Sequence, residues 1–99
     1  MTFARAALLL SAGPLAWAVH FLAIYGFTGV ACARAMPAAV PWAIALATIA
    51  AAAVCATVIA HALRARESFE HWLAGALAAA ALVAIAWEAL PVFLVRPCA

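Results

Sequence analysis

Charged side chains are scarce in this sequence, and two common kinds are missing altogether. Only 8% of its 99 residues are charged, against about a quarter in soluble domains. There is no aspartate and no lysine, and the serines are Ser11 and Ser68 alone. These absences leave no P-loop lysine, no Ser-His-Asp triad and no paired catalytic carboxylates, so we expect a chain that is not an enzyme.

The charge that is present does not suit nucleic acid. The net charge is +2, whereas nucleic-acid binding calls for a clustered basic stripe. Most of the rest is apolar, because 74% of the residues are hydrophobic. A small soluble domain buries only about 60% of the surface that its unfolded chain exposes, too little to hide so much apolar surface. The lipid bilayer is therefore the expected surroundings of the chain.

Three apolar runs are each long enough to cross a bilayer, which takes about 20 residues of helix. They predict an all-α, integral membrane three-helix bundle, with residues 1–99 as one membrane domain and spans at about 6–33, 42–63 and 72–95. Pro37 and Pro41 separate the first two spans, because proline cannot continue a helix and suits its first turn. A short polar turn, Arg64–His71, separates the second span from the third.

Arginines and tryptophans predict the orientation. The arginines divide three to two between the sides, as Arg5, Arg64 and Arg66 against Arg34 and Arg96. The positive-inside rule then gives an N-in, C-out topology. Trp42 and Trp72 suit opposite membrane interfaces, where indole rings gather. The motif AWA at 16–18 resembles a signal-peptide cleavage site, but the apolar run continues well beyond it, which favours an uncleaved anchor.

The three cysteines leave at least one thiol unpaired within the chain. In the N-in, C-out topology Cys32 ends the first span and Cys98 follows the third, on the same outer side. That compartment is oxidising in bacteria, which favours a Cys32–Cys98 disulfide. The alternative is a pair of free thiols near copper(I), which soft thiolates suit. Cys55 lies within the second span and is interpreted as a small packing residue.

His20 and Glu88 are ionisable residues deep in the first and third spans. His20 precedes Cys32 by 12 residues and Glu88 precedes Cys98 by 10, which is about 18 Å and 15 Å of helix. If the cysteines are joined, His20 and Glu88 lie at similar depth on neighbouring helices. A charge at the centre of a membrane helix costs roughly 2.5–3.5 kcal/mol. We therefore expect the two residues to pair with each other or to face another subunit.

Three roles for this pair stay open. The favoured one is a hydrogen-bonded clasp between helices or subunits. The second is a proton relay, because histidine titrates near neutrality, and the weakest is haem ligation by His20, for which a second imidazole at matching depth is missing. Pro91 bears on all three. A helix that ends at Leu90 would leave Glu88 near the interface, whereas a helix kinked through Pro91 would keep it in the membrane.

Small residues predict close helix packing. Gly75 and Ala79 form a small-xxx-small pair in the third span, and Gly26 and Gly29 lie in the first. Such surfaces let membrane helices approach closely. Three short helices cannot satisfy so many small-residue faces among themselves, which favours a larger membrane partner.

Two more histidines, His61 and His71, flank the polar turn. They are ten positions apart, and no metal-ligand motif of recognised spacing is present. A solvated turn is the better interpretation, so no metal site is predicted. The chain also lacks the span count and inverted repeats of a stand-alone transporter.

Two segments resemble a known class of protein. GPLAWAVHFLAIYGFTGVACA at 13–33 and WEALPVFLVRPC at 87–98 resemble small three-span proteins associated with bacterial haem–copper cytochrome oxidases. The resemblance implies an accessory role beside a redox enzyme in the bacterial inner membrane, with no redox centre in this chain. His20, Trp87, Glu88 and the two outer cysteines are the family-like positions.

The resulting expectation is a non-catalytic accessory subunit or assembly partner of a respiratory oxidase complex. Its partners would be oxidase subunits and lipid, and it would take no cofactor and no small-molecule substrate. Two rivals stay open. One is a homo-oligomeric channel or transporter with His20 and Glu88 along a polar path, which should cross-link to itself. The other is a metal or haem delivery factor that uses the cysteines and histidines, which should carry its cargo after purification.

Overall fold

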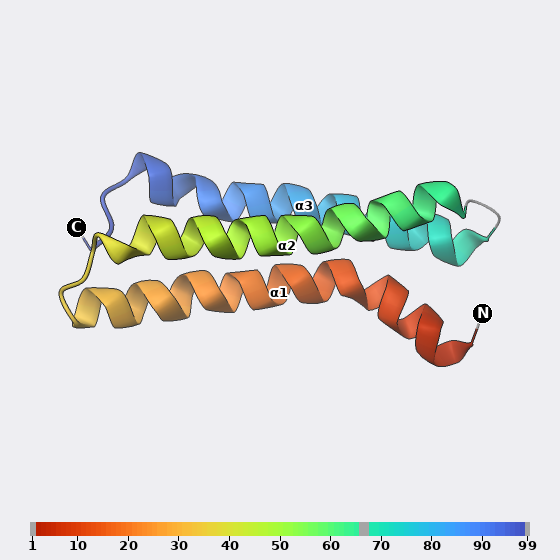
Figure 1. Cartoon of the computed structure of the whole chain (residues 1–99), viewed down its shortest axis with the longest axis horizontal. Helices are drawn as coiled ribbons and strands as arrows, with labels where there is room; N and C mark the ends of the chain where they lie inside the picture. Colours follow the sequence, from red (N-terminus) through yellow and green to blue (C-terminus); the bar gives the residue numbers. More distant parts are fainter. Residues whose placement is uncertain (1, 66–67, 99) are drawn as a thin grey trace.

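Three long helices run side by side in the computed structural model, which describes residues 2–65 and 68–98 (Figure 1). They are α1 (Phe3–Ala33), α2 (Ala39–Arg64) and α3 (Phe69–Leu94). All three are long and apolar enough to cross a membrane, and no strand occurs in the two described ranges. The predicted all-α, three-helix membrane bundle is confirmed. Both ends of each predicted span lie within three residues of the corresponding ends of its helix.

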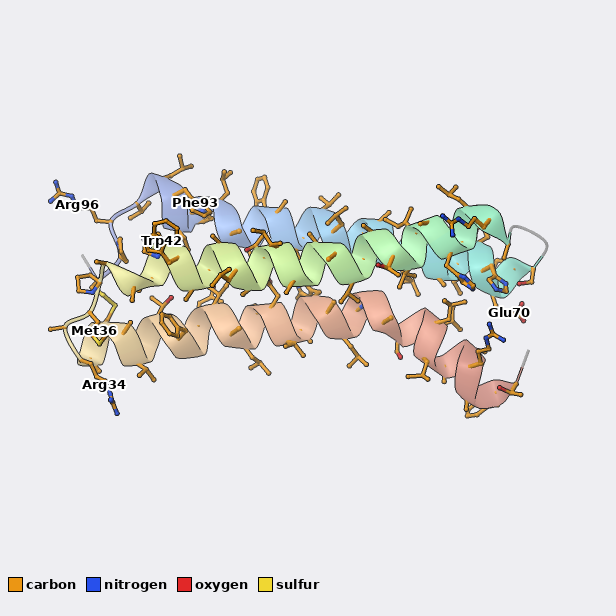
Figure 2. All side chains as sticks on the ribbon, in the orientation of Figure 1. Arg34, Met36, Trp42, Glu70, Phe93 and Arg96 are labelled. Carbon is orange, nitrogen blue, oxygen red and sulfur yellow. A yellow bond between two sulfur atoms is a disulfide. The ribbon has the colours of Figure 1, made fainter. Side chains whose placement is uncertain are left out.

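The two ends of the bundle differ in what they carry. At one end, here called the disulfide end, the connection from α1 to α2 lies beside the segment that follows α3 (Figure 1). Arg34 and Arg96 point away from the helices there, and Glu70 lies at the opposite end, here called the turn end (Figure 2). Arg34 and Arg96 therefore share one end, as the prediction divided them; which end faces outward stays a prediction.

Tryptophans lie near both ends. Trp42 is 77% exposed in the first turn of α2, and Trp72 is 63% exposed in the first turn of α3. The 20 residues from Trp42 to Ala62 span about 30 Å of helix. Ala62 is level with Gly75, and Trp72 lies about one turn beyond. The two indoles are thus about 35 Å apart along the bundle, somewhat more than the thickness of a hydrocarbon core, and their place at opposite interfaces stays a prediction.

Local signals account for the helix ends. Thr2 Oγ1 accepts the Arg5 N–H at 3.3 Å at the start of α1, which is the ordinary N-cap bond of threonine. At the other end of α1, the Met36 N–H donates to the Ala31 carbonyl at 2.8 Å. This bond closes a Schellman turn in which Ala35 has a φ of 54°, a conformation that glycine usually provides.

Both internal prolines lie within continuous helices. Of the two alternatives for Pro91, the structure has the continuous helix, because α3 runs on to Leu94 and the Val95 N–H donates to the Pro91 carbonyl at 2.8 Å. Glu88 is therefore helical and lies among the other spans. Pro14 lies inside α1, and the part of α1 before it bends away from α2 (Figure 1), as expected where proline interrupts the hydrogen-bond ladder.

Alanine and glycine bring the helices close together. Ala74 and Ala78 of α3 are at most 1% exposed, and Cys55 of α2 is fully buried among them, as its interpretation as a packing residue requires. A Cβ on Gly13 would lie 2.7 Å from the Ala78 Cα, and one on Gly75 would lie 2.9 Å from the Ala62 Cβ. These glycines therefore sit where α3 meets α1 and α2.

The other small residues face outward. A Cβ on Gly26 or Gly29 would meet no described atom within 4 Å, and Ala79 is exposed. Of the four small residues in the packing prediction, only Gly75 brings two helices of this chain together. For Gly26, Gly29 and Ala79 the prediction of close packing is not met within residues 2–65 and 68–98, where nothing packs on the two glycines.

Candidate functional site

Each helix contributes one polar side chain to a single level of the bundle. His20 of α1 lies between Glu88 of α3 and Thr48 of α2, and these three residues are here called the polar layer. His20 Nδ1 is 3.1 Å from Glu88 Oε2, and His20 Nε2 is 2.9 Å from Thr48 Oγ1. The structure thus brings together the two residues that the sequence suggested as partners, and it adds a third.

Helical periodicity places these side chains inside. His20 lies on the stripe of α1 that also buries Gly13, Ile24 and Ala31, at intervals of seven and four residues. This spacing follows one face of an α-helix. The side chains of Ile44 and Ile85, both 1% exposed, lie one turn from Thr48 and Glu88 on their own helices. The polar layer is therefore built into the apolar core of the bundle.

The hydrogen bonds assign the protons. Thr48 Oγ1 donates to the Ile44 carbonyl at 2.7 Å, the i−4 bond that threonine makes within helices. Its single proton is then used, so the oxygen accepts from His20 Nε2–H. This assignment of the tautomer, made from the network, leaves Nδ1 facing Glu88 with one proton between them. Whether that proton sits on nitrogen or oxygen, the net charge of the pair is zero.

Neutrality suits the surroundings of the layer. The His20 side chain has no exposed surface and that of Glu88 is 17% exposed. Thr48 lies six residues after Trp42, about 9 Å along the helix, so the layer lies in the half of the span nearer the disulfide end. A net charge at such a depth carries a large desolvation cost. The shared proton avoids that cost.

The space beside His20 is apolar. A groove of about 420 Å³ runs between α1 and α2, and among the described residues that line it, His20 is the one polar residue beside alanines, valines and a leucine. Leu15, Val19 and Val54 supply its branched side chains. No chain of polar groups leads from the polar layer along this groove in the described part of the protein. The groove therefore offers His20 no hydrated path to either end.

A disulfide joins Cys32 and Cys98 at the disulfide end. Their Cα atoms are 5.4 Å apart, across 66 positions of the sequence. Cys32 lies in the last turn of α1, and Cys98 lies in the segment that turns back after α3. The bond therefore ties the first span to the segment after the third. Glu88 lies within two turns of the same end of α3.

Replacing Cys98 by serine should change the number of reactive thiols in the denatured, unreduced protein from one to two. Wild-type protein exposes only Cys55 on denaturation, because Cys32 is in the disulfide. The variant adds Cys32, and its mobility on non-reducing electrophoresis should match that of the reduced wild-type chain. A thiol count that does not rise on substitution would exclude the bond.

The remaining candidate residues lie at the turn end. The rings of His61 and His71 have centroids 5.4 Å apart, much closer than their separation in sequence suggested. Across residues 2–65 and 68–98, no group of three or more histidines, cysteines or carboxylates is placed to hold a metal ion. Arg66 and Glu67, which entered the predictions for orientation and turn, lie outside the described residues.

Sequence reasoning missed Thr48 and Gly13. Threonine is common in membrane helices, and Thr57 of α2 makes the same kind of i−4 bond on an exposed face, so residue type alone gives no signal. The available signal was position, because Thr48 lies four residues after Ile44 on the buried stripe of α2. For Gly13, the proline that follows it, Pro14, could have signalled a special position in the helix but not its partner.

Comparisons with known proteins give no further guidance. No protein-family model matches the chain, and the searches of curated proteins and of solved structures found no match either. The function therefore has to be inferred from the polar layer, the disulfide and the outward faces of the helices.

Proposed function

We propose that this chain is a non-catalytic accessory subunit or assembly partner of a larger membrane complex, a respiratory haem–copper oxidase of the bacterial inner membrane. The observation that carries the proposal is that the polar layer is satisfied within the chain. Both ring nitrogens of His20 have partners on the other two helices. The layer then acts as a clasp that holds the helices in register and leaves their outer faces free for a partner.

The closed polar layer favours the interpretation as a clasp rather than as part of a channel. A conduction path needs polar groups that face water or one another along the span. Here the imidazole has no exposed surface, and the groove beside it has apolar walls. The hydrogen bonds run across the bundle from helix to helix, which holds the three spans together without extending toward either side.

One face of α1 suits a neighbouring membrane helix. Gly26 and Gly29 have no side chains, and no described atom outside the helix's own backbone lies within 4 Å of where a Cβ would be. On the same helix, the rings of Phe21 and Tyr25 contact each other with centroids 4.6 Å apart and planes inclined by 47°, and they remain 39% and 64% exposed. A small-residue face beside aromatic rings allows close packing of a second helix.

The resemblance described above supplies the kind of complex. It covers residues 13–33, which include His20 and both outward glycines, and residues 87–98, which include Glu88 and Cys98. In the N-in, C-out orientation the disulfide would lie on the outer side. No redox centre is proposed for this chain, and its contribution to the complex would be structural.

Purification of the tagged chain from its native membranes in mild detergent tests the proposal. Oxidase subunits should accompany it in stoichiometric amounts, as identified by mass spectrometry. Replacing Gly26 and Gly29 by leucine should lower their recovery at least tenfold without unfolding the chain, because both positions are open. Ala56→Leu, at an exposed position of α2, is the matched control and should have no effect.

The rivals give different results in the same experiment. Recovery of the chain alone as a homo-oligomer would overturn the proposal in favour of a channel or transporter. Stoichiometric metal or a haem Soret band on the purified chain, without oxidase subunits, would favour a delivery factor instead.

A further inference from the structure

The turn end brings two histidines of neighbouring helices face to face. His61 lies in the last turn of α2 and His71 in the first turn of α3. Their ring centroids are 5.4 Å apart and their planes are inclined by 44°. His61 is exposed and His71 is partly exposed, so both rings lie at the surface of the bundle.

This spacing is the one that a shared metal ion requires. Two imidazoles bound to one tetrahedral ion, each with a metal–nitrogen bond of about 2.0–2.1 Å, have ring centres about 5 Å apart. Both histidines are attached to helix ends, so the backbone holds them at this distance. A shared ion then requires one nitrogen of each ring to face a common point.

Ser68 orients one of the two rings. Its Oγ is in hydrogen-bond contact with His71 Nδ1, and it also accepts the His71 backbone N–H at 3.3 Å as the N-cap of α3. Holding Nδ1 in this way leaves Nε2 as the outward nitrogen. Histidines that bind metals are usually held through their other nitrogen like this. Neither nitrogen of His61 has a hydrogen-bond partner among the described residues.

We propose that His61 and His71 form a binding site for a divalent ion of the Zn²⁺, Ni²⁺ and Cu²⁺ class, which imidazole ligands suit. The protein supplies two ligands and water completes the coordination. Glu70, exposed in the same first turn of α3, adds a favourable charge, whereas Arg64 of α2 opposes it. The ion would join α2 to α3 at the end of the bundle opposite the disulfide. This site does not depend on the function proposed above.

Zn²⁺ titration of the purified, chelator-treated full chain in detergent tests the site. Competition with a chromophoric chelator should give one ion per chain. His61→Ala and His71→Ala should each weaken binding at least tenfold, since either leaves a single imidazole. Glu70→Gln, which removes a neighbouring charge but no ligand, should change affinity by less than about threefold. Circular dichroism of each variant shows whether the helices remain.

A second measurement keeps the result clear if a variant is less stable. Zn²⁺ should raise the thermal midpoint of the wild-type chain, and this rise should vanish when both histidines are replaced by asparagine. The proposal is overturned if either single variant binds Zn²⁺ as the wild type does. It is also overturned if one ion binds per two chains, because the histidines would then bridge copies.

Discussion

Replacing His20 by alanine should lower the free energy of unfolding of the bundle by about 3 kcal/mol. The imidazole is fully buried and bonds to both Glu88 and Thr48. Its removal leaves the Glu88 carboxyl group without its partner in the membrane and opens a cavity where the ring lay. These two effects dominate, because interhelical hydrogen bonds in membranes contribute only about 0.6 kcal/mol on average.

Unfolding of the purified variants in mixed micelles, followed by circular dichroism, measures the effect. Glu88→Gln is the matched control, because its amide can donate to His20 Nδ1 and keep the layer neutral, so its loss should stay below about 1 kcal/mol. Thr48→Val keeps the shape of the side chain, removes its hydrogen bonds to His20 and to the Ile44 carbonyl, and should fall between the two. A His20→Ala protein as stable as Glu88→Gln would contradict the closed polar layer.

The same substitution bears on the proposed function. If the layer is a clasp, His20→Ala should reduce the amount of assembled oxidase more than the turnover of each assembled complex. A relay would give the opposite pattern, with normal assembly and reduced proton pumping. Measuring complex abundance and activity in the same membranes therefore distinguishes a positioning role of His20 from a role in proton transfer.

Most of the fold could be predicted from the sequence because the bilayer imposes few solutions. The apolar runs had to form helices, and the positions of Pro37 and Pro41 and of the polar turn separated them. Pro91 could not be decided in the same way. Whether a membrane helix continues through proline depends on neighbouring side chains, and the course of α3 to Leu94 is a property of the packed bundle.

Only part of the candidate site could be predicted from the sequence. His20 and Glu88 stand out because ionisable groups are costly in lipid and therefore rare in membrane helices. Thr48 has no such signal, since its hydroxyl can bond to its own helix. Without Thr48 the tautomer of His20 is undetermined, and so is the charge of the pair. The proton assignment therefore needs the arrangement of all three helices.

The glycines also show what the sequence alone cannot predict, namely which small residues lie where two helices cross. Gly26 and Gly29 form the more conspicuous small-residue pair, yet both face outward. Gly13 has no such partner in its helix and nevertheless meets the backbone of α3 at Ala78. Which small residue lies at a crossing depends on the rotation of each helix about its axis, and periodicity cannot resolve this where alanine occupies almost every face.

Adding one methyl group at Gly13 is the sharpest test of the packing. Gly13→Ala should lower the free energy of unfolding by about 2 kcal/mol, because the new Cβ would lie 2.7 Å from the Ala78 Cα. Backbone cannot yield as a side chain can, so α1 and α3 have to move apart. Mixed-micelle unfolding measures the loss, and a pair of spin labels on α1 and α3 measures the separation.

Gly26→Ala is the matched control for this change. It adds the same methyl group to the same helix where no described atom lies within 4 Å, so the free energy of unfolding should stay unchanged or rise by up to about 1 kcal/mol from the better helix propensity of alanine. Equal effects of the two substitutions would mean that α1 does not meet α3 at Gly13. A loss confined to Gly13→Ala would locate the crossing there and show that the Gly26 face takes no part in the packing of this bundle.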